Sequence, residues 1–417
     1  MKLLVVSQYF FPENFRVNEL VAELVRRGHE VTVLTGMPNY PQGRFFEGYG
    51  WRGPRHELFA GAKVLRVPLI PRGKGGGLRL VLNYLSFALF ASLVAFWRLP
   101  REHDAIFVFE VSPVTVGLPA IVAAWRSKAP ILFWVLDLWP QSLLATGAVR
   151  AGWLLKLVAQ GVRWIYSRCE LVLGQSRAFL DSIHELGADP VRLRYFPNWI
   201  EAEYEAAPST AKVIRQGEFR IVYAGNIGVA QDFPAIIEAA ALLAETAPHV
   251  RWVLAGDGRL FHWVKSEIYR RGLVGKFELL GQLPSACMPK LFASADALLV
   301  TLRADPVFSL TIPGKVQSYL ASGKPVLAMI DGEGARVVVE SGAGLVAAAG
   351  DSSQLARLAI QLAEMPVNDL AAMGLRARQY AMREFGRQKL FDRLEGWLQE
   401  AIEDYQLRTK SDYVRRL

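Results

Sequence analysis

The chain has 417 residues, more than one hydrophobic core usually supports, so two domains are expected. Hydrophobic residues make up 52% of the sequence and charged residues 21%, which excludes a disordered chain. The formal net charge is +9, and all of the excess lies in residues 1–200, where 23 Lys and Arg stand against 14 Asp and Glu. Such a field favours an anionic partner, such as nucleic acid, an anionic lipid surface or a phosphorylated acceptor.

Several classes of protein are disfavoured by what the sequence lacks. The two cysteines, Cys169 and Cys287, form no disulfide framework and fit a reducing cytosol. The first apolar run is too short for a signal peptide and is interpreted as a strand. There is no phosphate-binding P-loop, no zinc-ligand spacing and no nucleic-acid module, so nucleic acid is not an expected partner. Since no Asp-x-Asp pair is present to hold a divalent ion, we expect chemistry that needs no metal and no cofactor.

Short apolar runs alternate with longer amphipathic stretches along the chain. We predict strands at 2–7, 30–35, 63–68, 105–110, 131–137, 171–175 and 193–196, and then at 219–224, 251–256, 277–281, 297–302, 325–329 and 345–348. These runs are apolar without alternation, as strands buried on both faces are. Helical patterns such as 14–27, 233–246 and 313–322 lie between them. The sequence therefore predicts an α/β fold with two parallel, Rossmann-like sheets.

The strand–helix pattern restarts near residue 219. The stretch 201–217 is polar, contains Pro208 and has no strand pattern, which is typical of an interdomain linker. We expect an N-terminal domain over 1–200, a C-terminal domain over 218–385 and a charged helical tail over 386–417. In two-domain folds of this kind such a tail can return to the first domain.

The segment 78–99 has Arg79 and Arg98 near its ends and no charge between them. It lies between two predicted strands of one sheet, so a membrane-spanning helix is not expected there, although its length is at the lower limit for one. Two alternatives remain. The segment is either a buried crossover helix or an interfacial helix that dips into a membrane, with Trp97 and Tyr84 near the headgroups. The basic N-terminal half favours the second.

Two glycine-containing turns directly follow predicted strands of the second half. They are Gly225-Asn226-Ile227-Gly228 and Gly256-Asp257-Gly258. Glycines let backbone N–H groups approach a diphosphate, and a following helix N-terminus adds a favourable dipole. Asp257 is placed to accept from a hydroxyl or a backbone N–H. Ordinary tight turns are the alternative for both segments.

A third motif spans 311–326. Pro313 and Gly323 suit the start and the end of a helix. Lys315 then lies just inside a helix N-terminus, where a cation is disfavoured unless an anion binds there. A bound diphosphate resolves that conflict. Arg303 is a second candidate cation, with a surface salt bridge to Asp305 as its alternative.

Two segments of the first half carry candidate acceptor-side residues. Asp137 ends a central predicted strand, where ligands bind in open α/β sheets, and is a candidate for acid–base chemistry, with a helix cap as the alternative. Glu110 ends the neighbouring strand and is a weaker analogue. The loop 7–18 offers further polar side chains after the first strand: Glu13, Asn14, Arg16 and Asn18.

Five ordered motifs resemble the retaining glycosyltransferases of family 4, which have the GT-B fold. They are SQYFFPE, RGHEVTVLTGMPNYPQG, LDLWPQS, YAGNIGVAQ and IPGKVQSYLASGKPVL, and the nearest pattern is a bacterial O-antigen and colanic-acid subgroup that transfers fucosamine- or fucose-like sugars. The resemblance spans essentially the whole chain. It implies a nucleotide-sugar donor in the C-terminal domain, an acceptor in the N-terminal domain and retention at the anomeric carbon.

The sequence departs from the general family at four polar positions. By position, the family's Arg and Lys of the first loop fall on Asn226 and Gln231, and its two glutamates fall on Leu310 and Ser318. Donor charge is then left to Lys315, Arg303 and helix N-termini, and the ribose to Gln317 or Ser318. Leu310 suits a 6-deoxy or N-acetylated sugar.

The expected function is transfer of such a sugar, for example L-FucNAc, from a UDP-sugar or GDP-sugar, with UDP favoured. We expect the acceptor to be a lipid-diphosphate-linked glycan of O-antigen or capsule synthesis, and the protein to be cytoplasmic and peripheral on the inner face of an anionic membrane. Two alternatives are a nucleotide-sugar epimerase of the same fold and a non-catalytic nucleotide-sugar binder.

Overall fold

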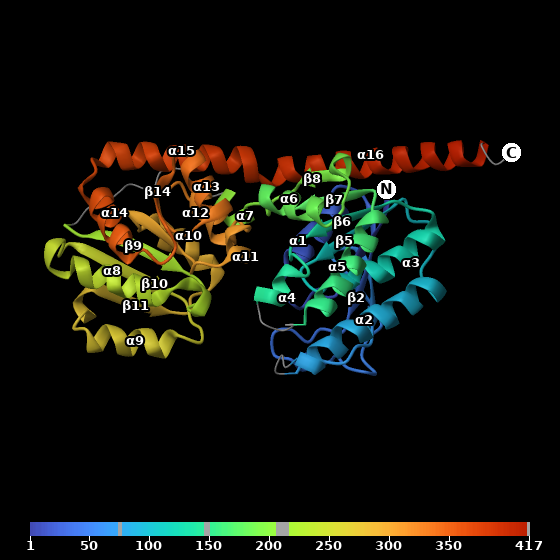
Figure 1. Cartoon of the computed structure of the whole chain (residues 1–417), viewed down its shortest axis with the longest axis horizontal. Helices are drawn as coiled ribbons and strands as arrows, with labels where there is room; N and C mark the ends of the chain where they lie inside the picture. The colour runs from blue at the N-terminus through green and yellow to red at the C-terminus, as the bar shows by residue number, and fades with distance from the viewer. Residues whose placement is uncertain (74–76, 146–150, 206–216, 415–417) are drawn as a thin grey trace. The chain divides into compact units, whose positions relative to one another are not determined.

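The computed structural model describes residues 1–73, 77–145, 151–205 and 217–414 (Figure 1). The chain divides into two compact units, one formed by 1–196 with 393–417 and the other by 197–392. The first unit thus ends before residue 200, and the return to it starts after residue 386. Most of the predicted linker, 206–216, lies outside the described residues. Its first part is not a linker, because Ala202–Glu205 form the short helix α7 with Tyr204 buried in the second unit.

The first unit contains one sheet, ordered β3-β4-β2-β1-β5-β6-β7-β8. Its strands are β1 (Lys2–Val6), β2 (Glu30–Gly36), β3 (His56–Phe59), β4 (Ala62–Val67), β5 (Ala105–Glu110), β6 (Ile131–Val135), β7 (Leu171–Gly174) and β8 (Leu193–Tyr195). All seven predicted runs form strands. Sequence reasoning missed β3, which is four residues long, half exposed and antiparallel to β4, so it lacks the apolar run of a central strand.

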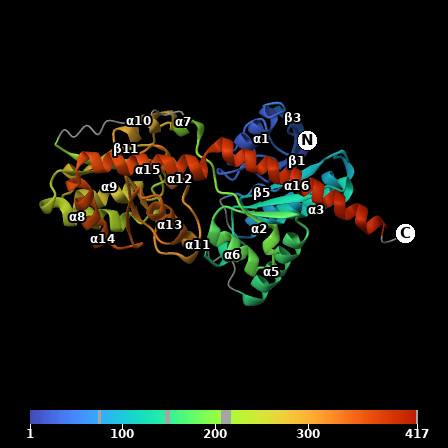
Figure 2. The same ribbon diagram turned by 90° about the horizontal axis from the view of Figure 1, so that it is seen from above.

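Helices cover both faces of this sheet. They are α1 (Arg16–Arg26), α2 (Gly77–Trp97), α3 (Gly117–Ser127), α4 (Gln141–Ala145), α5 (Gly152–Ser167), α6 (Arg177–Glu185) and the later part of α16 (Arg387–Val414). Arg194 pairs with Glu400 at 2.6 Å, and Trp397 packs edge-on against Phe196. These contacts attach the C-terminal helix to the strand β8, and α16 runs alongside the first unit in both views (Figures 1 and 2).

The second unit contains a sheet ordered β11-β10-β9-β12-β13-β14, parallel throughout. Its strands are β9 (Phe219–Ala224), β10 (Val250–Ala255), β11 (Phe277–Gly281), β12 (Ala297–Thr301), β13 (Val326–Met329) and β14 (Gly344–Ala347). Its helices besides α7 are α8 (Phe233–Thr246), α9 (Phe261–Arg270), α10 (Met288–Ala293), α11 (Pro306–Ser309), α12 (Gly314–Ala321), α13 (Gly332–Glu340), α14 (Ser352–Glu364) and α15 (Val367–Phe385). The six predicted runs all form strands.

Each sheet has one point where the strand order reverses. In the first unit it lies between β1 and β5, and in the second between β9 and β12. Loops that follow two such strands diverge to opposite faces and leave a crevice at the carboxyl edge, which is where open α/β sheets bind ligands. The loop 7–18, the loop 225–231 and Arg303 follow strands at these two points, and Glu110 is the last residue of β5.

Candidate functional site

The site of the second unit is built on the loop after β9. Gly225 has a φ of +134°, and a Cβ there would lie 2.5 Å from Cε of Lys315. Gly256 has a φ of +147°, and its Cβ would overlap the Gly225 carbonyl oxygen. Since glycine has no side chain at either position, the two turns can lie close to each other and to the lysine. Gly228 and Gly258 continue these turns, and Gly258 N–H donates to the exposed Asp257 carboxylate at 2.7 Å.

Lys315 is the central cation of this site. Its amine donates to the Tyr223 hydroxyl and lies 3.7 Å from the centre of that ring. Among the described residues no carboxylate pairs with it, and burial alone lowers its pKa to about 7. A buried amine without a counterion, at the N-terminus of a helix, is stabilised by an anion. The predicted position of Lys315 at a helix N-terminus is thus the observed one, since α12 begins at Gly314.

The two positions where the family has cations lie together but are occupied by amides. Gln231 accepts from the Asn226 amide at 3.3 Å and from Gly228 N–H at 3.2 Å. The glutamine therefore closes the short turn Val229–Gln231. The local shape of the loop persists without its usual positive charge, which leaves the positive charge to Lys315 and its neighbours.

Helix α12 adds two more polar groups. Gln317 is 1% exposed, and neither its amide oxygen nor its amide nitrogen has a partner among the described residues. Ser318 is buried and donates to Glu201 at 3.2 Å.

Arg303 is half exposed and lies 3.7 Å from Asp305, so the surface salt bridge that we gave as the alternative is present. An exposed pair of this kind contributes little and does not exclude contact with a ligand.

The site of the first unit contains two adjacent carboxyl groups. Glu110 is 1% exposed and accepts from Asp137 N–H at 3.3 Å, while its other oxygen has no partner among the described residues. Burial, and then the nearby Asp137 charge, raise the pKa of Glu110 well above its usual value. Asp137 accepts from the Trp139 indole at 3.1 Å and from Ser142, yet burial still raises its pKa. The pair thus consists of an inner carboxyl, whose neutral form burial favours, and an outer, more accessible carboxyl.

The loop 7–18 does not present all the side chains that we expected. The Glu13 carboxylate is buried and accepts from three backbone N–H groups, those of Phe10, Asn39 and Tyr40. Burial raises the pKa of Glu13 to about 7 despite these hydrogen bonds. Asn18 bridges the Phe11 N–H and the Glu13 carbonyl. The prediction that both reach an acceptor is therefore wrong, because both fix the loop itself.

The two other residues predicted in this loop, Asn14 and Arg16, keep at least part of their surface. Asn14 is exposed, and Arg16 is half-buried at the start of α1. They are therefore more accessible than the buried Glu13.

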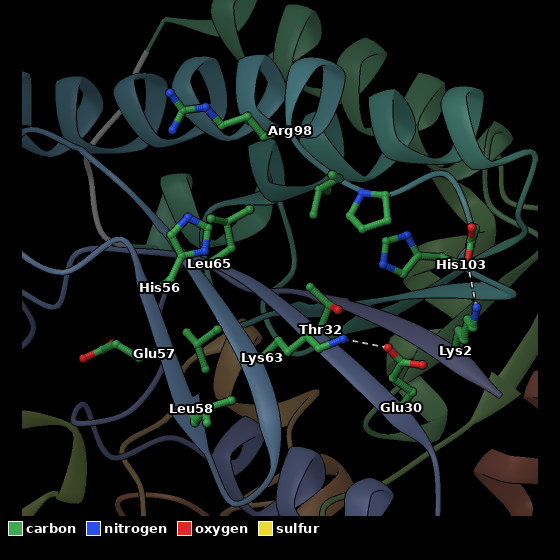
Figure 3. Close-up of a pocket in the computed structure, with 14 residues that line it drawn as sticks. Lys2, Glu30, Thr32, His56, Glu57, Leu58, Lys63, Leu65, Arg98 and His103 are labelled. Carbon is green, nitrogen blue, oxygen red and sulfur yellow. Dashed lines mark hydrogen bonds and ion pairs between the residues drawn. The ribbon is translucent and has the colours of Figure 1, made fainter.

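One cavity in the described part of the chain lies away from both sites. It has a volume of about 790 Å³ and is lined at the amino ends of β1, β2 and β4 (Figure 3). Two ion pairs cross its rim, Lys2 with Glu102 and Lys63 with Glu30. Because ligands of open α/β sheets bind at the opposite edge, we assign no donor or acceptor to it.

Helix α2 packs with its less apolar face inward. The buried side chains include Asn83, Ser86, Ala88 and Ala91, and Asn83 is fixed by Gln8 at 2.7 Å and by the Ile70 carbonyl at 2.6 Å. Its leucines are exposed, as are tryptophans on α3 and α5: Leu78, Leu82, Leu85, Leu89, Leu93, Trp97, Trp125, Trp153 and Trp164. We call these residues the apolar outer face. The helix is a crossover between β4 and β5, but it is not buried as one alternative required.

Among the described residues, α2 is also the one helix long and apolar enough to cross a membrane by length and composition, with 28% of that stretch buried. No group of three or more His, Cys, Asp or Glu side chains in the described part of the chain is arranged to hold a metal ion.

Comparison with known proteins fits this architecture. Residues 14–199 match the glycosyl transferase 4-like domain, and residues 218–365 match the glycosyl transferases group 1 family. Together the two matches account for most of the chain, which therefore belongs to the family 4, group 1 glycosyltransferases. It is 27% identical over 345 residues to the Escherichia coli K12 protein named as the colanic acid biosynthesis glycosyl transferase WcaI, covering 78% of this chain and 82% of that one. It is 28% identical over 253 residues to WbjE of Pseudomonas aeruginosa, named as a glycosyltransferase, covering 58% of this chain and 62% of that one.

Solved structures show that the fold is GT-B. The structure of Anabaena HepE with UDP superposes with a TM-score of 0.70 at 17% identity, covering 96% of this chain and all of that one. WaaG, a glycosyltransferase involved in lipopolysaccharide biosynthesis, superposes with a TM-score of 0.61 at 13% identity, covering 94% and 98%. At these identities the likeness shows the fold, and the chemistry must be argued from this chain's own residues.

Proposed function

We propose that this glycosyltransferase moves a sugar from a nucleoside diphosphate donor, bound by the second unit, to a lipid-diphosphate-linked glycan in surface polysaccharide synthesis. The observation that carries the donor assignment is Lys315, a buried amine that lacks a carboxylate partner among the described residues and lies against the glycine turn at Gly225. UDP is favoured as the nucleotide, in keeping with the UDP complex of HepE. The colanic acid assignment of WcaI supports a polysaccharide product.

In this proposal the leaving diphosphate gains negative charge in the transition state. The Lys315 ammonium and the N-terminus of α12 stabilise that charge most when the sugar–phosphate bond is broken. Gly256 and Gly258 allow the second turn to approach the same phosphates. Asn226, Gln231 and Asp257 shape the two turns, and Arg303 adds a weaker, exposed charge. Departure and attack on one face of the sugar give retention of configuration.

The acceptor chemistry is assigned to the first unit. Asp137 orients or deprotonates the acceptor hydroxyl, because it is the more accessible carboxylate of the pair. Glu110 accepts from the Asp137 backbone N–H, and its burial disfavours a second negative charge in the site. Asn14 and Arg16 are the acceptor-side groups of the loop 7–18. The sugar is 6-deoxy or N-acetylated, such as L-FucNAc, since Leu310 stands where the family has a glutamate.

A lipid-linked acceptor fits the apolar outer face. Soluble proteins rarely expose so many leucines and tryptophans on neighbouring helices, and tryptophans favour the membrane interface. The net positive charge of residues 1–200 adds attraction to anionic lipids. The protein is accordingly proposed to be peripheral on the cytoplasmic face of the cell membrane. This face also favours the transferase over the epimerase, whose reaction needs no lipid acceptor.

The first test is a thermal-shift series with UDP, GDP and their sugar conjugates. A ligand at about 100 times its dissociation constant adds roughly 2.7 kcal/mol of apparent stability. Stabilisation by one nucleoside diphosphate in the wild type, and its loss in Lys315→Ala, supports the donor assignment. Equal melting temperatures with and without every nucleotide contradict it. Product analysis with donor alone then separates a transferase from an epimerase, because the epimerase alters the donor sugar without any acceptor.

A further inference from the structure

The chain lacks a carboxylate at position 318 of α12, yet a carboxylate lies beside it in space. Glu201 comes from a segment more than one hundred residues earlier in the chain, and its Oε2 accepts from the Ser318 hydroxyl at 3.2 Å. Glu201 immediately precedes α7, which packs against α12 within the second unit (Figure 1). Glu201 lies in the segment predicted as a linker, and the sequence patterns indicate no role for it.

The segment that carries Glu201 is held firmly on both sides. Before it, Trp199 is fully buried against Phe391, and Ile200 N–H donates to the Phe385 carbonyl at 2.9 Å. After it, Tyr204 stacks on Phe292 at 5.5 Å. A carboxylate fixed in this way is pre-organised for binding, because little conformational entropy is lost when a ligand arrives.

An arginine completes the anchoring of this segment. Arg378 donates to the carbonyls of Tyr204 and Glu205 at 3.2 and 3.0 Å and to the Ala321 carbonyl at 2.6 Å. Since Ala321 is the last residue of α12, the same side chain ties Glu201's segment to the helix that carries Lys315.

The glycine turn at Gly225 and the Glu201 carboxylate lie at two positions along α12. Lys315 and Ser318 are three residues apart on α12, so they lie on one face with a rise of roughly 4.5 Å between them. The Lys315 end of this face meets the glycine turn at Gly225, and the Ser318 end meets Glu201. A diphosphate held at the first end places the attached ribose near the second.

A second observation points to a ligand at the same helix end. The amide of Gln317 is buried, and its oxygen and nitrogen both lack partners among the described residues. Its oxygen lies 4.0 Å from the place where a Cβ of Gly314 would be, at the first turn of α12. A buried amide with no partner is rare in a folded protein and indicates a group that the ligand supplies.

We infer that Glu201 accepts the ribose hydroxyls of the donor nucleotide and so serves as the carboxylate that α12 itself does not carry. This inference rests on the proposed function, since it needs a nucleotide at Lys315. Two carboxylate oxygens accept from two neighbouring hydroxyls, which is the recognition that acidic residues give a ribose in other α/β nucleotide sites. Ser318 orients the carboxylate, and Gln317 supplies further polar contacts.

Isothermal titration calorimetry on the full chain tests this assignment. UDP and GDP are titrated first, and the tighter binder is then compared with its 2′,3′-dideoxy form and with inorganic pyrophosphate. Glu201→Gln should weaken the ribonucleotide about tenfold or more, because the neutral amide keeps only one acceptor oxygen for the two hydroxyls. It should leave the dideoxy nucleotide and pyrophosphate within about twofold of wild type. Lys315→Ala, by contrast, should weaken all three.

The matched control is Glu203→Gln, which changes the same residue type on α7 at an exposed position. It should bind the ribonucleotide as wild type does. Unchanged ribonucleotide binding in Glu201→Gln overturns the inference, and so does an equal loss for ribonucleotide and pyrophosphate, which indicates a merely structural residue. If wild type binds neither UDP nor GDP, the proposed function itself fails and the inference falls with it. Unfolding temperatures without ligand show whether each variant is folded.

Discussion

The two units share one architecture and differ in the sign of the charge that they bury at the strand reversal. The second unit buries an amine, Lys315, which lacks a carboxylate partner among the described residues and lies at glycine turns that admit no side chains. The first unit buries a carboxyl, Glu110, behind a more accessible Asp137. Desolvation pushes the amine and the carboxyls toward their neutral forms. The crevice at the strand reversal thus suits an anion in the second unit. The equivalent crevice in the first unit suits a hydroxyl group and its proton.

The outer surfaces differ in the same way. The first unit carries the excess positive charge of residues 1–200 and the apolar outer face of α2, α3 and α5. Residues 201–417 have no net charge, with 25 basic against 25 acidic residues. The two units therefore differ in the charge and the hydropathy of the surfaces that they expose.

The largest effect is expected at Asp137, the more accessible carboxyl of the first unit. Asp137→Asn keeps the shape of the side chain but removes its ability to take a proton, so we expect turnover to fall by about 10²–10⁴. Nucleotide affinity should stay unchanged, because the donor binds in the other unit. Steady-state kinetics with a lipid-linked acceptor and titration calorimetry with UDP measure the two quantities. Wild-type turnover in this variant would remove Asp137 from the mechanism.

The next largest effect is expected at the buried amine. Lys315→Ala removes a charge-assisted contact of the diphosphate, so nucleotide affinity should fall about 10- to 100-fold. Arg303→Ala serves as the control, because its guanidinium is half exposed and already lies near Asp305. Its effect should be only a few-fold. If the two variants lost equal affinity, the buried cation would not be the principal phosphate contact.

The membrane assignment is tested on α2. Leu85→Ser with Leu89→Ser removes two exposed side chains of the apolar outer face, at 52% and 58% exposure. Since about half of each leucine is exposed, stability should fall only slightly, while binding to anionic vesicles falls about tenfold or more. Flotation with phosphatidylglycerol-containing vesicles measures this. Leu407→Ser, an exposed leucine of α16, should float as wild type does. Equal flotation of all three proteins argues against the proposed face.

Nucleotide affinity should also depend on pH through Lys315. Its pKa of about 7 without ligand means that the amine is protonated below pH 7 and mostly neutral above it. A bound diphosphate raises that pKa, so binding above pH 7 takes up a proton and affinity falls, by at most about tenfold per pH unit. Below pH 7 this group gives no further dependence. Calorimetry between pH 6 and 9 measures the slope, and Lys315→Met should flatten it.

Some features of the fold and of the site can be predicted from local sequence patterns, and others cannot. Central strands are visible because they are buried on both faces, and β6 reads as an unbroken apolar run. The edge strand β3 is half exposed and carries no such run, so it is missed. The position of Lys315 at a helix N-terminus is predictable, because Pro313 marks the start of the helix. The local role of Glu13 is not, because its three backbone partners come together only when Asn39 and Tyr40 fold beside it.

The same limit applies to the features that the sequence could not reveal. Hydropathy marks 78–99 as apolar but does not say which side faces the sheet, and the inward face proves to hold Asn83 and Ser86. The contact of Glu201 with Ser318 joins positions over one hundred residues apart, beyond any local pattern. Short sequence motifs can thus be interpreted from the sequence, whereas hydrogen bonds between residues far apart in the chain cannot.

The smallest predicted effect decides which carboxyl of the first unit carries the charge. Burial raises the pKa of Glu110 and so favours its neutral form, and Glu110→Gln replaces the carboxyl with a neutral hydrogen-bonding group of nearly equal shape. Turnover should stay within about threefold of wild type, in contrast to the large loss in Asp137→Asn. Glu110→Ala, which leaves the Asp137 N–H without its acceptor, should lower turnover further by displacing the loop. If instead Glu110→Gln abolished activity while Asp137→Asn did not, the inner carboxyl would be the base and the assignment of the two groups would be reversed.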